Sequence, residues 1–570
     1  MVETFQQCVH RLGEQSGYPE RGLRFCFGRE ANHLAGVFLA WPQVAARVRG
    51  LATRLRRQGV GGGDVVVVHS HDQQTALLAI LGAIHLGAIP TAVAPLGDGA
   101  AARLVEQFHA VVAVAAPTLI VSDRELPAEH VAGRQLPPVL LVEQFDESES
   151  APIARQATPD DPCFLQFTSG STSVPKGVVV THRMLLANLA SITAAIDWNA
   201  DGCTVGWLPI YHDMSLVGIY SMAVFHRARG CFFPSSRFGR SPDLWLTLMA
   251  QERANFSAAP NFAFAMVNRF AERRPPTGDL SCVKGLICGS EPLSVEVLRR
   301  FSQLHASCGL VNPVLPAFGM AECTLMATHG VPGAPLVTLV VERSALERQR
   351  RVLLTDREGL IAGAGPTRAI ELVGCGTPAV GMQVAIYHEG ALVGDDVVGE
   401  VLLAGTSVLS RYWRHDAATA AAFLTVDGQT WFRTGDLGFL HAGQLFICGR
   451  AKDLIIHNGV NYYPADLEAA LENALPEQVR LAAVVDLRSE LAAPFLGLGV
   501  LFEEGKKSDD PAATEAAVAD FISLYTGLPV AIALALRGEH IPRTTSGKLV
   551  RGAIRERLLT ARGQLFPSRS

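Results

Sequence analysis

The stretch that decides the fold is FLQFTSGSTSVPKGVVVTHRM, residues 164–184. It places hydroxyl side chains, glycines and one lysine between two apolar segments, and the first of these, residues 164–167, is typical of a strand. Glycine lets the backbone approach a ligand closely, and oriented N–H groups, hydroxyls and a lysine suit a phosphate chain. The GxxxxGK[ST] spacing of a Walker A loop is absent. A polar surface turn is the alternative, and the full string favours an anion-binding loop.

The rest of the chain has the composition of a globular enzyme. Its 570 residues indicate more than one domain, and a net charge of -5 argues against nucleic acid or an anionic membrane as the main partner. Eleven cysteines occur singly, without CxxC pairs or Cys/His ligand spacing, so we expect reduced thiols in a cytoplasmic protein. The N-terminus lacks the pattern of a secretory signal.

Short apolar runs alternate with helical patterns along the chain. Residues 65–69 (VVVVH) predict a buried strand, residues 73–86 a helix and residues 89–94 the next strand. The most apolar stretch, residues 76–96, is therefore expected to be buried and not to cross a membrane. Further strands are predicted at residues 139–142, 178–180, 285–287 and 314–317. This alternation predicts an α/β architecture with parallel sheets.

A change of composition marks the last part of the chain. Residues 394–405 (GDDVVGEVLLAG) predict a turn and a strand, and a second glycine-rich cluster follows at residues 434–459. The remaining residues suffice for a separate small unit. We expect the boundary near residues 450–452.

The loop TSGSTSVPKG, residues 168–177, resembles the phosphate-binding signature of adenylate-forming enzymes, the superfamily of acyl-CoA synthetases, peptide-synthetase adenylation domains and luciferases. These usually carry Gly at the position of Ser173. Five more blocks follow in the family's order: CGSEP (288–292), AFGMAE (317–322), TGD (434–436), GRAKD (449–453) and PRTTSGK (542–548). The resemblance implies a large N-terminal domain of residues 1–450, with parallel-sheet and β-rich subdomains, and a small mobile C-terminal α+β domain of residues 451–570.

The resemblance also implies a role for each block, with ATP and Mg²⁺ as cofactors. Phe318, which replaces the commoner Tyr, would stack on adenine; Glu322 would hold Mg²⁺, and Lys548 would bridge the carboxylate and the α-phosphate. The implied catalytic residues are Lys548, Glu322, Thr168 and His212. The implied nucleotide-binding residues are Thr168, Ser169, Gly170, Ser171, Thr172, Lys176, Gly289, Ser290, Glu291, Phe318, Gly319, Met320, Asp436 and Arg450. The implied acid-binding residues are His212, Met214, Asn261 and Met320, and the hinge is Lys452.

Other blocks resemble the fatty acyl-AMP ligases within this superfamily. WLPIYHDM, residues 207–214, is similar to their WLPxYHDMG block, with Ser215 in place of Gly. NGVNYYP (458–464) and LVGCG (372–376) resemble two more, the latter with Gly374 in place of Ser. The extra sequence at about residues 331–367 resembles an insertion that acyl-CoA synthetases generally lack, although an ordinary surface hairpin and helix is the alternative.

His212 would gate the acyl pocket without acting as a general base, because a fatty carboxylate is already ionised at neutral pH. Asp213 is expected to be its structural hydrogen-bond partner. An apolar tunnel is expected from Ile210, Met214, Ile219, Phe225, Phe262, Phe264 and Met320. Arg543, Arg551, Arg555 and Arg557 are expected either to meet an acidic carrier helix or to form a solvated basic face.

The implied activity is an AMP-forming fatty acid ligase. It would make acyl-adenylate from a fatty acid and ATP, release pyrophosphate, and pass the acyl group to the phosphopantetheine of an acyl carrier protein in lipid, polyketide or lipopeptide biosynthesis. One alternative is an acyl-CoA synthetase that uses CoA. The other is a non-catalytic acyl- or nucleotide-binding protein, against which Lys548, Glu322 and Asp436 argue.

Overall fold

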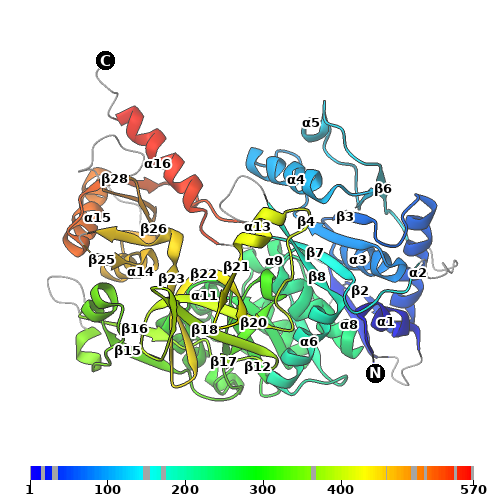
Figure 1. Cartoon of the computed structure of the whole chain (residues 1–570), viewed down its shortest axis with the longest axis horizontal. Helices are drawn as coiled ribbons and strands as arrows, with labels where there is room; N and C mark the ends of the chain where they lie inside the picture. Colours follow the sequence, from blue (N-terminus) through cyan, green and yellow to red (C-terminus); the bar gives the residue numbers. More distant parts are fainter. Residues whose placement is uncertain are drawn as a thin grey trace. The chain divides into compact units, whose positions relative to one another are not determined.

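The structure is a computed structural model, and it describes residues 2–14, 20–27, 36–145, 155–168, 175–360, 368–457, 459–488, 497–505, 510–544 and 548–565 (Figure 1). Contacts divide the chain into two compact units. The first comprises Met1–Leu336, Cys375–Val384 and Leu403–Phe432; the second comprises Val337–Gly374, Ala385–Leu402 and Arg433–Ser570. The two-domain boundary at residues 450–451 stays a prediction.

A nine-stranded sheet dominates the first unit, in the order β17-β14-β13-β12-β11-β9-β10-β1-β2. The parallel strands are β1 (Gly22–Cys26), β9 (Cys203–Gly206), β10 (Arg229–Phe232), β11 (Phe256–Pro260), β12 (Gly285–Gly289) and β13 (Val314–Gly319). The strands β2 (Gly36–Ala40), β14 (Met326–His329) and β17 (Thr377–Pro378) add antiparallel edges. β9, β11 and β12 are buried along their whole length, as central parallel strands require.

A second, four-stranded parallel sheet has the order β4-β3-β5-β6. Its strands are β3 (Val65–His69), β4 (Ile89–Val93), β5 (Leu119–Ser122) and β6 (Val139–Leu141). Helix α3 (Gln73–Leu86) connects β3 to β4 and packs against helix α2 (Trp41–Arg57). Asp72 caps the start of α3 and left-handed Gly87 ends it. The predicted buried helix and strand in residues 76–96 are confirmed.

None of the helices in the described part of the chain is long and apolar enough to cross a membrane.

The quoted stretch forms an antiparallel hairpin. β7 (Pro162–Thr168) pairs with β8 (Lys176–Thr181), and Thr168 lies opposite Lys176. The strand predicted at residues 178–180 therefore exists, but it does not join a parallel sheet. The connection of residues 169–175 is too short for that, because a parallel crossover needs about a dozen residues or more.

The insertion, residues 331–367, contributes a hairpin and short helical turns. Its strand β15 (Thr338–Glu342) pairs with β16 (Ala369–Val373), which directly follows the insertion, and the turns η5 (Ala345–Gln349) and η6 (Arg357–Leu360) lie between the two strands. Residues 361–367 lie outside the described part of the chain. The local structure thus has the strand pair and helical turns expected from the alternative of an ordinary hairpin and helix.

The β-rich part of the chain includes β20 (Gly399–Gly405), at the predicted turn and strand, and the pair β22 (Gln429–His441) and β23 (Gln444–Arg450). In the C-terminal segment, residues 451–570, β26 (Val479–Asp486), β27 (Leu498–Glu504) and β28 (Val530–Leu536) form a three-stranded sheet.

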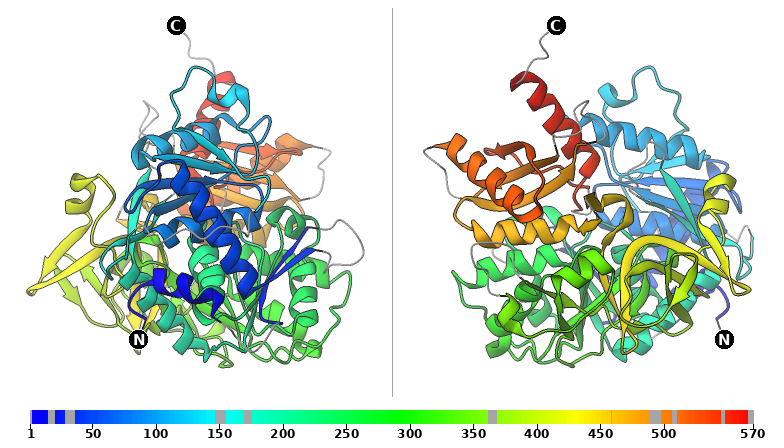
Figure 2. Two further views of the ribbon diagram at one scale, coloured as in Figure 1. Left: turned by 90° about the vertical axis from the view of Figure 1, so that its right-hand side faces the viewer. Right: turned by 60° about the vertical axis from the view of Figure 1, so that its left-hand side comes forward.

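Helices cover both faces of this C-terminal sheet (Figure 2). α14 (Pro464–Ala474) and α15 (Pro511–Thr526) pack on the face that carries Val484, Val500 and Phe502. α16 (Arg551–Leu565) packs on the face that carries Val485 and Leu501. Alternation along each strand thus buries both faces, and the predicted α+β character of this segment is confirmed.

Candidate active site

Two predicted blocks and the predicted residue Asn261 lie at the carboxyl ends of neighbouring parallel strands in the nine-stranded sheet. Asn261 follows β11, Ser290 and Glu291 follow β12, and the segment from Phe318 to Glu322 ends β13 and continues past it. Because β11, β12 and β13 are parallel neighbours, these turns come together at one edge of the sheet. This is the edge at which open α/β sheets bind ligands.

Hydrogen bonds connect the first two of these turns. The backbone N–H of Phe262 donates to Glu291 Oε1 at 2.5 Å, and the N–H of Ser294 donates to Asn261 Oδ1 at 3.1 Å. Ser290 adopts a positive φ of 74°, which few non-glycine residues adopt. Through these two bonds, Glu291 and Asn261 hold the turns after β11 and β12 together.

Two predicted glycines are required by packing between strands. A Cβ on Gly289 would lie 2.7 Å from the carbonyl oxygen of Ala317, and one on Gly319 would collide with the carbonyl oxygen of Leu325. β12 and β13 each need a glycine where a backbone carbonyl approaches this closely.

Glu322 lies in the turn η4 (Ala321–Cys323), which follows β13. Its carbonyl oxygen accepts a hydrogen bond from Leu409 N at 2.7 Å, and its carboxylate Oε1 accepts one from Tyr412 Oη at 3.0 Å. Buried Asn188 donates its side-chain amide to the carbonyls of Cys323 and Met326 at 3.3 and 2.9 Å. The turn is therefore held from two sides.

The two ends of the phosphate loop lie in the same unit as η4. Gly177 O accepts a hydrogen bond from Trp413 N at 2.7 Å, and Val178 forms a bridge with Tyr412. The Nζ atom of Lys176 lies 5.2 Å from the centroid of the Tyr412 ring. Thr168 is described opposite Lys176. Ser169, Gly170, Ser171 and Thr172 lie outside the described residues.

His212 stands beside the hairpin that carries this loop. Gln166 of β7 donates its side-chain amide to the carbonyl of Tyr211 at 2.8 Å. Asp213 Oδ1 lies 2.8 Å from His212 Nδ1 and accepts the N–H of Met214 at 2.8 Å, which fits the structural role expected of Asp213.

The residues predicted to line an acyl tunnel differ in their surroundings. Ile210, Met214 and Ile219 are buried in or before the helical turns that follow His212. Phe264 packs edge-to-face against Trp245 and Phe301, with ring centroids 5.5 and 4.9 Å apart. Phe264 therefore belongs to an aromatic core shared by α10 (Leu244–Gln251), α11 (Asn261–Ala271) and α12 (Val295–His305).

In the second unit, Asp436 and Arg450 lie opposite each other on β22 and β23, with Arg450 Nε 2.9 Å from Asp436 Oδ1. The other oxygen, Oδ2, is buried, and within the described residues it has no hydrogen-bond partner. Burial raises the pKa of Asp436, while the charges of Arg450, Lys548 and Lys452 act against this rise. A buried acceptor without a donor is suited to a ligand hydroxyl, such as that of a ribose.

Lys452 and Lys548 belong to the same unit as Asp436. Lys452 lies in η7 (Ala451–Asp453), where burial lowers its pKa although Asp453 acts against the shift. Lys548 closes its loop through a bond from Thr544 N to its carbonyl oxygen at 2.7 Å and one from its N–H to Thr544 Oγ1 at 3.0 Å. Residues 545–547 between them are outside the described part of the chain.

Sequence reasoning did not identify Tyr412, Asn188 or Gln166. Tyr412 lies in SRYWRHD, and neither this stretch nor the sequence around the other two residues has a spacing that signals a site. Their roles depend on tertiary contacts that join segments far apart in the chain.

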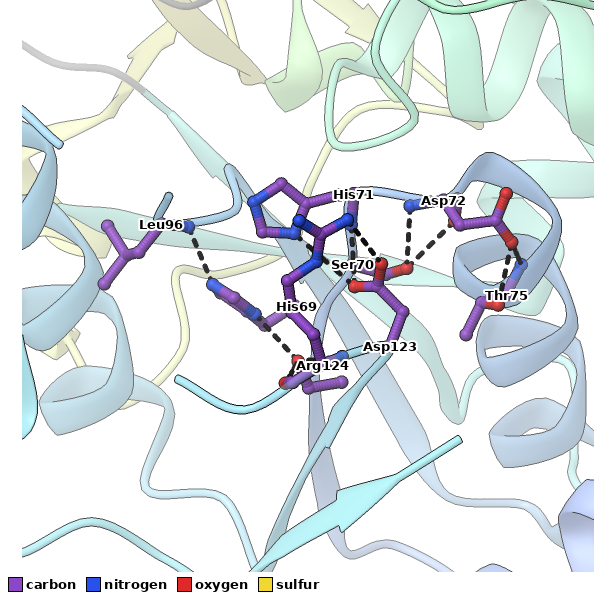
Figure 3. Close-up of polar contacts among 9 residues, drawn as sticks. His69, Ser70, His71, Asp72, Thr75, Leu96, Asp123 and Arg124 are labelled. Carbon is purple, nitrogen blue, oxygen red and sulfur yellow. Dashed lines mark hydrogen bonds and ion pairs between the residues drawn. The ribbon is translucent and has the colours of Figure 1, made fainter. Parts of the chain in front are cut away.

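A histidine cluster at the carboxyl ends of β3 and β5 does not form a catalytic triad (Figure 3). His69 Nε2 accepts the N–H of Leu96 at 2.7 Å, so the ring proton is on Nδ1, which lies 3.1 Å from Ser122 Oγ. Ser122 Oγ in turn donates to the carbonyl of Arg124 at 2.6 Å. Burial lowers the pKa of His69 to about 4. The neutral ring therefore donates to the serine and does not activate it.

The residues of the first unit fit Mg²⁺ and nucleotide phosphates. Glu322 supplies a carboxylate, the hard oxygen ligand that Mg²⁺ prefers, and phosphates and water commonly complete its coordination. Lys176 supplies a positive charge at the end of the phosphate loop.

The AMP-binding enzyme family matches residues 20–413, which is more than half of the chain. The chain belongs to this family, and the predicted resemblance to adenylate-forming enzymes is confirmed. Among its relatives, the long-chain-fatty-acid–AMP ligase FadD26 of Mycobacterium tuberculosis is 33% identical over 549 residues and covers 91% of each chain. The 4-hydroxyphenylalkanoate adenylyltransferase of Mycobacterium tuberculosis is 30% identical over 555 residues, covering 91% of this chain and 86% of the other.

Among solved structures, one from a study of fatty acyl-adenylate ligases of E. coli and L. pneumophila superposes with a TM-score of 0.86 at 27% identity and covers 99% of both chains. The predicted fold class and the likeness to fatty acyl-AMP ligases are confirmed.

Proposed function

We propose that this enzyme is a fatty acyl-AMP ligase that passes its acyl group to an acyl carrier protein. The observation that carries the proposal is that the turn of Ser290 and Glu291 after β12 and the Glu322 turn after β13 meet at one sheet edge. The segment from Leu409 to Trp413 joins the Glu322 turn to the end of the phosphate loop.

The first half-reaction is an electrostatic problem, because a carboxylate must attack the α-phosphorus of a polyanion. Lys176 and the phosphate loop would orient the β- and γ-phosphates, and Asp436 Oδ2 would accept a ribose hydroxyl. Lys548 would bridge the carboxylate and the α-phosphate and neutralise charge where it develops. Glu322 would hold Mg²⁺ bound with ATP, and this cation would neutralise the phosphates further. Pyrophosphate leaves, and the acyl-adenylate remains.

The second half-reaction needs a different face of the C-terminal segment. We propose that this segment rotates about Lys452, so that Lys548 leaves the site and a phosphopantetheine thiol enters. The thiol sulfur then attacks the acyl carbon, the bond to the adenylate oxygen breaks, and AMP leaves.

Contacts of the insertion support a carrier protein as the acceptor. Asn461 of the C-terminal segment donates its side-chain amide to the carbonyl of Glu347 at 2.8 Å, and the guanidinium of Arg343 lies 4.9 Å from the Tyr525 ring centroid. Such contacts would oppose the rotation that admits free CoA. A carrier protein would add docking contacts that favour the rotated arrangement, whereas CoA brings only its own contacts.

The basic residues proposed for carrier docking are largely engaged within the C-terminal segment. Arg551 is partly buried, with Nη1 2.6 Å from Glu468 Oε1 and 2.7 Å from the carbonyl of Val484. Arg557 pairs with Glu539, and Arg555 donates to the carbonyl of Asp486 at 3.1 Å. Arg551 is therefore a structural residue, and we do not expect it to contact a carrier protein.

The tail of the acid is proposed from two observations. The relatives described above act on a long-chain fatty acid and on a 4-hydroxyphenylalkanoate, and both acids carry an apolar tail behind the carboxylate. Met214 and Ile219, buried after His212, are apolar as such a tail requires.

A cytoplasmic location is proposed from the eleven free thiols.

Incubation with ATP, Mg²⁺ and a ladder of fatty acids tests the proposal, with acyl-AMP read by mass spectrometry and pyrophosphate by a coupled assay. Acyl-AMP should appear with pyrophosphate in equal amounts. Binding of acid or ATP without pyrophosphate release would favour the non-catalytic alternative. Efficient thioester formation with CoA would favour the acyl-CoA synthetase.

A further inference from the structure

We infer that Tyr412 is a positioning residue for the adenylation half-reaction: its hydroxyl fixes the carboxylate of Glu322, and its ring face holds the ammonium group of Lys176. The inference rests on the roles proposed above for Glu322 and Lys176. It assigns Tyr412 the task of coupling the metal-binding carboxylate to the phosphate loop.

The geometry of the side chain carries the first step. Tyr412 Oη lies 3.0 Å from Glu322 Oε1, and Lys176 Nζ lies 5.2 Å from the Tyr412 ring centroid, within the range of a cation–π contact. The side chain is 4% exposed. The phenol hydroxyl is the donor and the Glu322 carboxylate is the acceptor.

The backbone of Tyr412 explains why one residue reaches both groups. It forms a bridge with Val178 of β8, and the next residue, Trp413, donates to the carbonyl of Gly177. Tyr412 N also donates to Thr419 Oγ1 at 3.0 Å. The backbone is thus fixed to the strand that begins at Lys176, while the side chain extends to the turn that carries Glu322.

Each contact has a distinct consequence for catalysis. A hydrogen bond to one carboxylate oxygen sets the rotamer of Glu322, and such outer contacts tune how well a ligand holds its metal. The ring holds Lys176 by its face without bringing a negative charge to it. An acidic partner would partly neutralise the charge of Lys176, whereas the ring leaves this charge available to the phosphates.

Tyr412→Phe and Tyr412→Leu separate the two contacts. Phe keeps the ring and loses the hydroxyl, so it should weaken binding of the metal–nucleotide complex and leave Lys176 in place. Leu removes both contacts and should also raise the KM for ATP. Tyr220→Phe is the matched control, because Tyr220 is equally buried and its hydroxyl has no hydrogen-bond partner in the described part of the chain.

The readout is Mn²⁺ binding measured by electron paramagnetic resonance in the presence of a non-hydrolysable ATP analogue, together with the Mg²⁺ dependence of pyrophosphate release. Tyr412→Phe should raise the Mn²⁺ concentration at half-saturation about 10-fold, at the low end of what lost outer contacts cost metal sites, with the KM for fatty acid unchanged. Tyr412→Leu should add a further loss of about 2- to 30-fold in kcat/KM for ATP.

Glu322→Gln separates failure of this inference from failure of the proposed function. If Glu322→Gln binds Mn²⁺ as the wild type does, the role proposed for Glu322 is wrong. If Glu322→Gln weakens binding and Tyr412→Phe behaves as Tyr220→Phe does, only the role of Tyr412 is overturned. Thermal unfolding of each variant checks folding, and should Tyr412→Leu not fold, Tyr412→Phe alone decides.

Discussion

The side-chain amide of Asn461 donates to the backbone carbonyl of Glu347 at 2.8 Å, and both residues are buried. This bond joins the C-terminal segment to the insertion. Beside it, Arg343 pairs with the Glu347 carboxylate at 3.3 Å and lies over the ring of Tyr525. The insertion is thus anchored to the segment that we propose rotates.

We expect Glu347→Gln to change how stability depends on pH. Burial raises the pKa of Glu347 from 4.5 to about 7, although Arg343 and Arg348 oppose the shift and Asp466 adds to it. Because the folded pKa exceeds the unfolded one, the contribution of Glu347 is fully present below about pH 4.5 and is lost as pH rises through 7. The difference of pKa corresponds to about 3 kcal/mol.

Thermal unfolding between pH 4.5 and 8 checks this. The melting temperatures of wild type and Glu347→Gln should coincide near pH 4.5, and the variant should melt higher at pH 8. A difference in melting temperature that does not change with pH would contradict a buried Glu347 carboxyl group with a raised pKa. Glu389→Gln, at an exposed position, is the control and should follow the wild type throughout.

Asp436→Ala should weaken ATP binding more than it changes the preference among fatty acids. Oδ2 of Asp436 is a buried acceptor without a hydrogen-bond donor among the described residues, and loss of a charged acceptor costs about 1.5–3 kcal/mol. The KM for ATP should therefore rise by about 10-fold or more. An unchanged KM for ATP, with Glu389→Ala as the exposed control, would count against the ribose assignment.

Lys548→Ala should abolish acyl-AMP formation and leave the fold intact. Removal of a group that stabilises developing charge costs on the order of 3 kcal/mol or more, which is a rate loss above about 100-fold. Pyrophosphate release and thermal unfolding are the measurements. Arg537→Ala removes another cation of the same segment, from an exposed pair with Glu504, and should retain activity. Comparable rates in the two variants would remove Lys548 from the mechanism.

Deletion of residues 331–367 should raise the yield of acyl-CoA relative to acyl-AMP, because the contacts at Arg343 and Glu347 go with it. Asn461→Ala removes one of these contacts without a deletion and should shift the ratio in the same direction by a smaller amount. Product ratios by mass spectrometry decide, provided that adenylation itself persists. An unchanged ratio in both variants would exclude the insertion as the barrier to CoA.

Local chemistry explains which parts of the fold were predictable. β3 and α3 were predicted to the residue, because a valine run, the cap Asp72 and the left-handed Gly87 set their ends locally. The site turns were predictable as blocks, since each follows a buried strand. The pairing of β7 with β8, instead of a place in a parallel sheet, depends on the short connection between the two strands.

Long-range contacts explain what the sequence did not reveal. Tyr412 and Glu322 are 90 positions apart, and Arg551 and Glu468 are 83 apart. No periodicity links such residues, because only the folded chain brings them together. The same is true of Phe264, whose place among core rings depends on Trp245 and Phe301.

The most direct test of the account is the fate of a labelled fatty acid given to the intact enzyme with ATP, Mg²⁺ and CoA. The products are separated by chromatography and identified by mass spectrometry. The account predicts acyl-AMP in amounts that match the enzyme and the released pyrophosphate, with little acyl-CoA even at high CoA concentration. Conversion of most of the label to acyl-CoA, or the absence of any acyl-AMP, would contradict it.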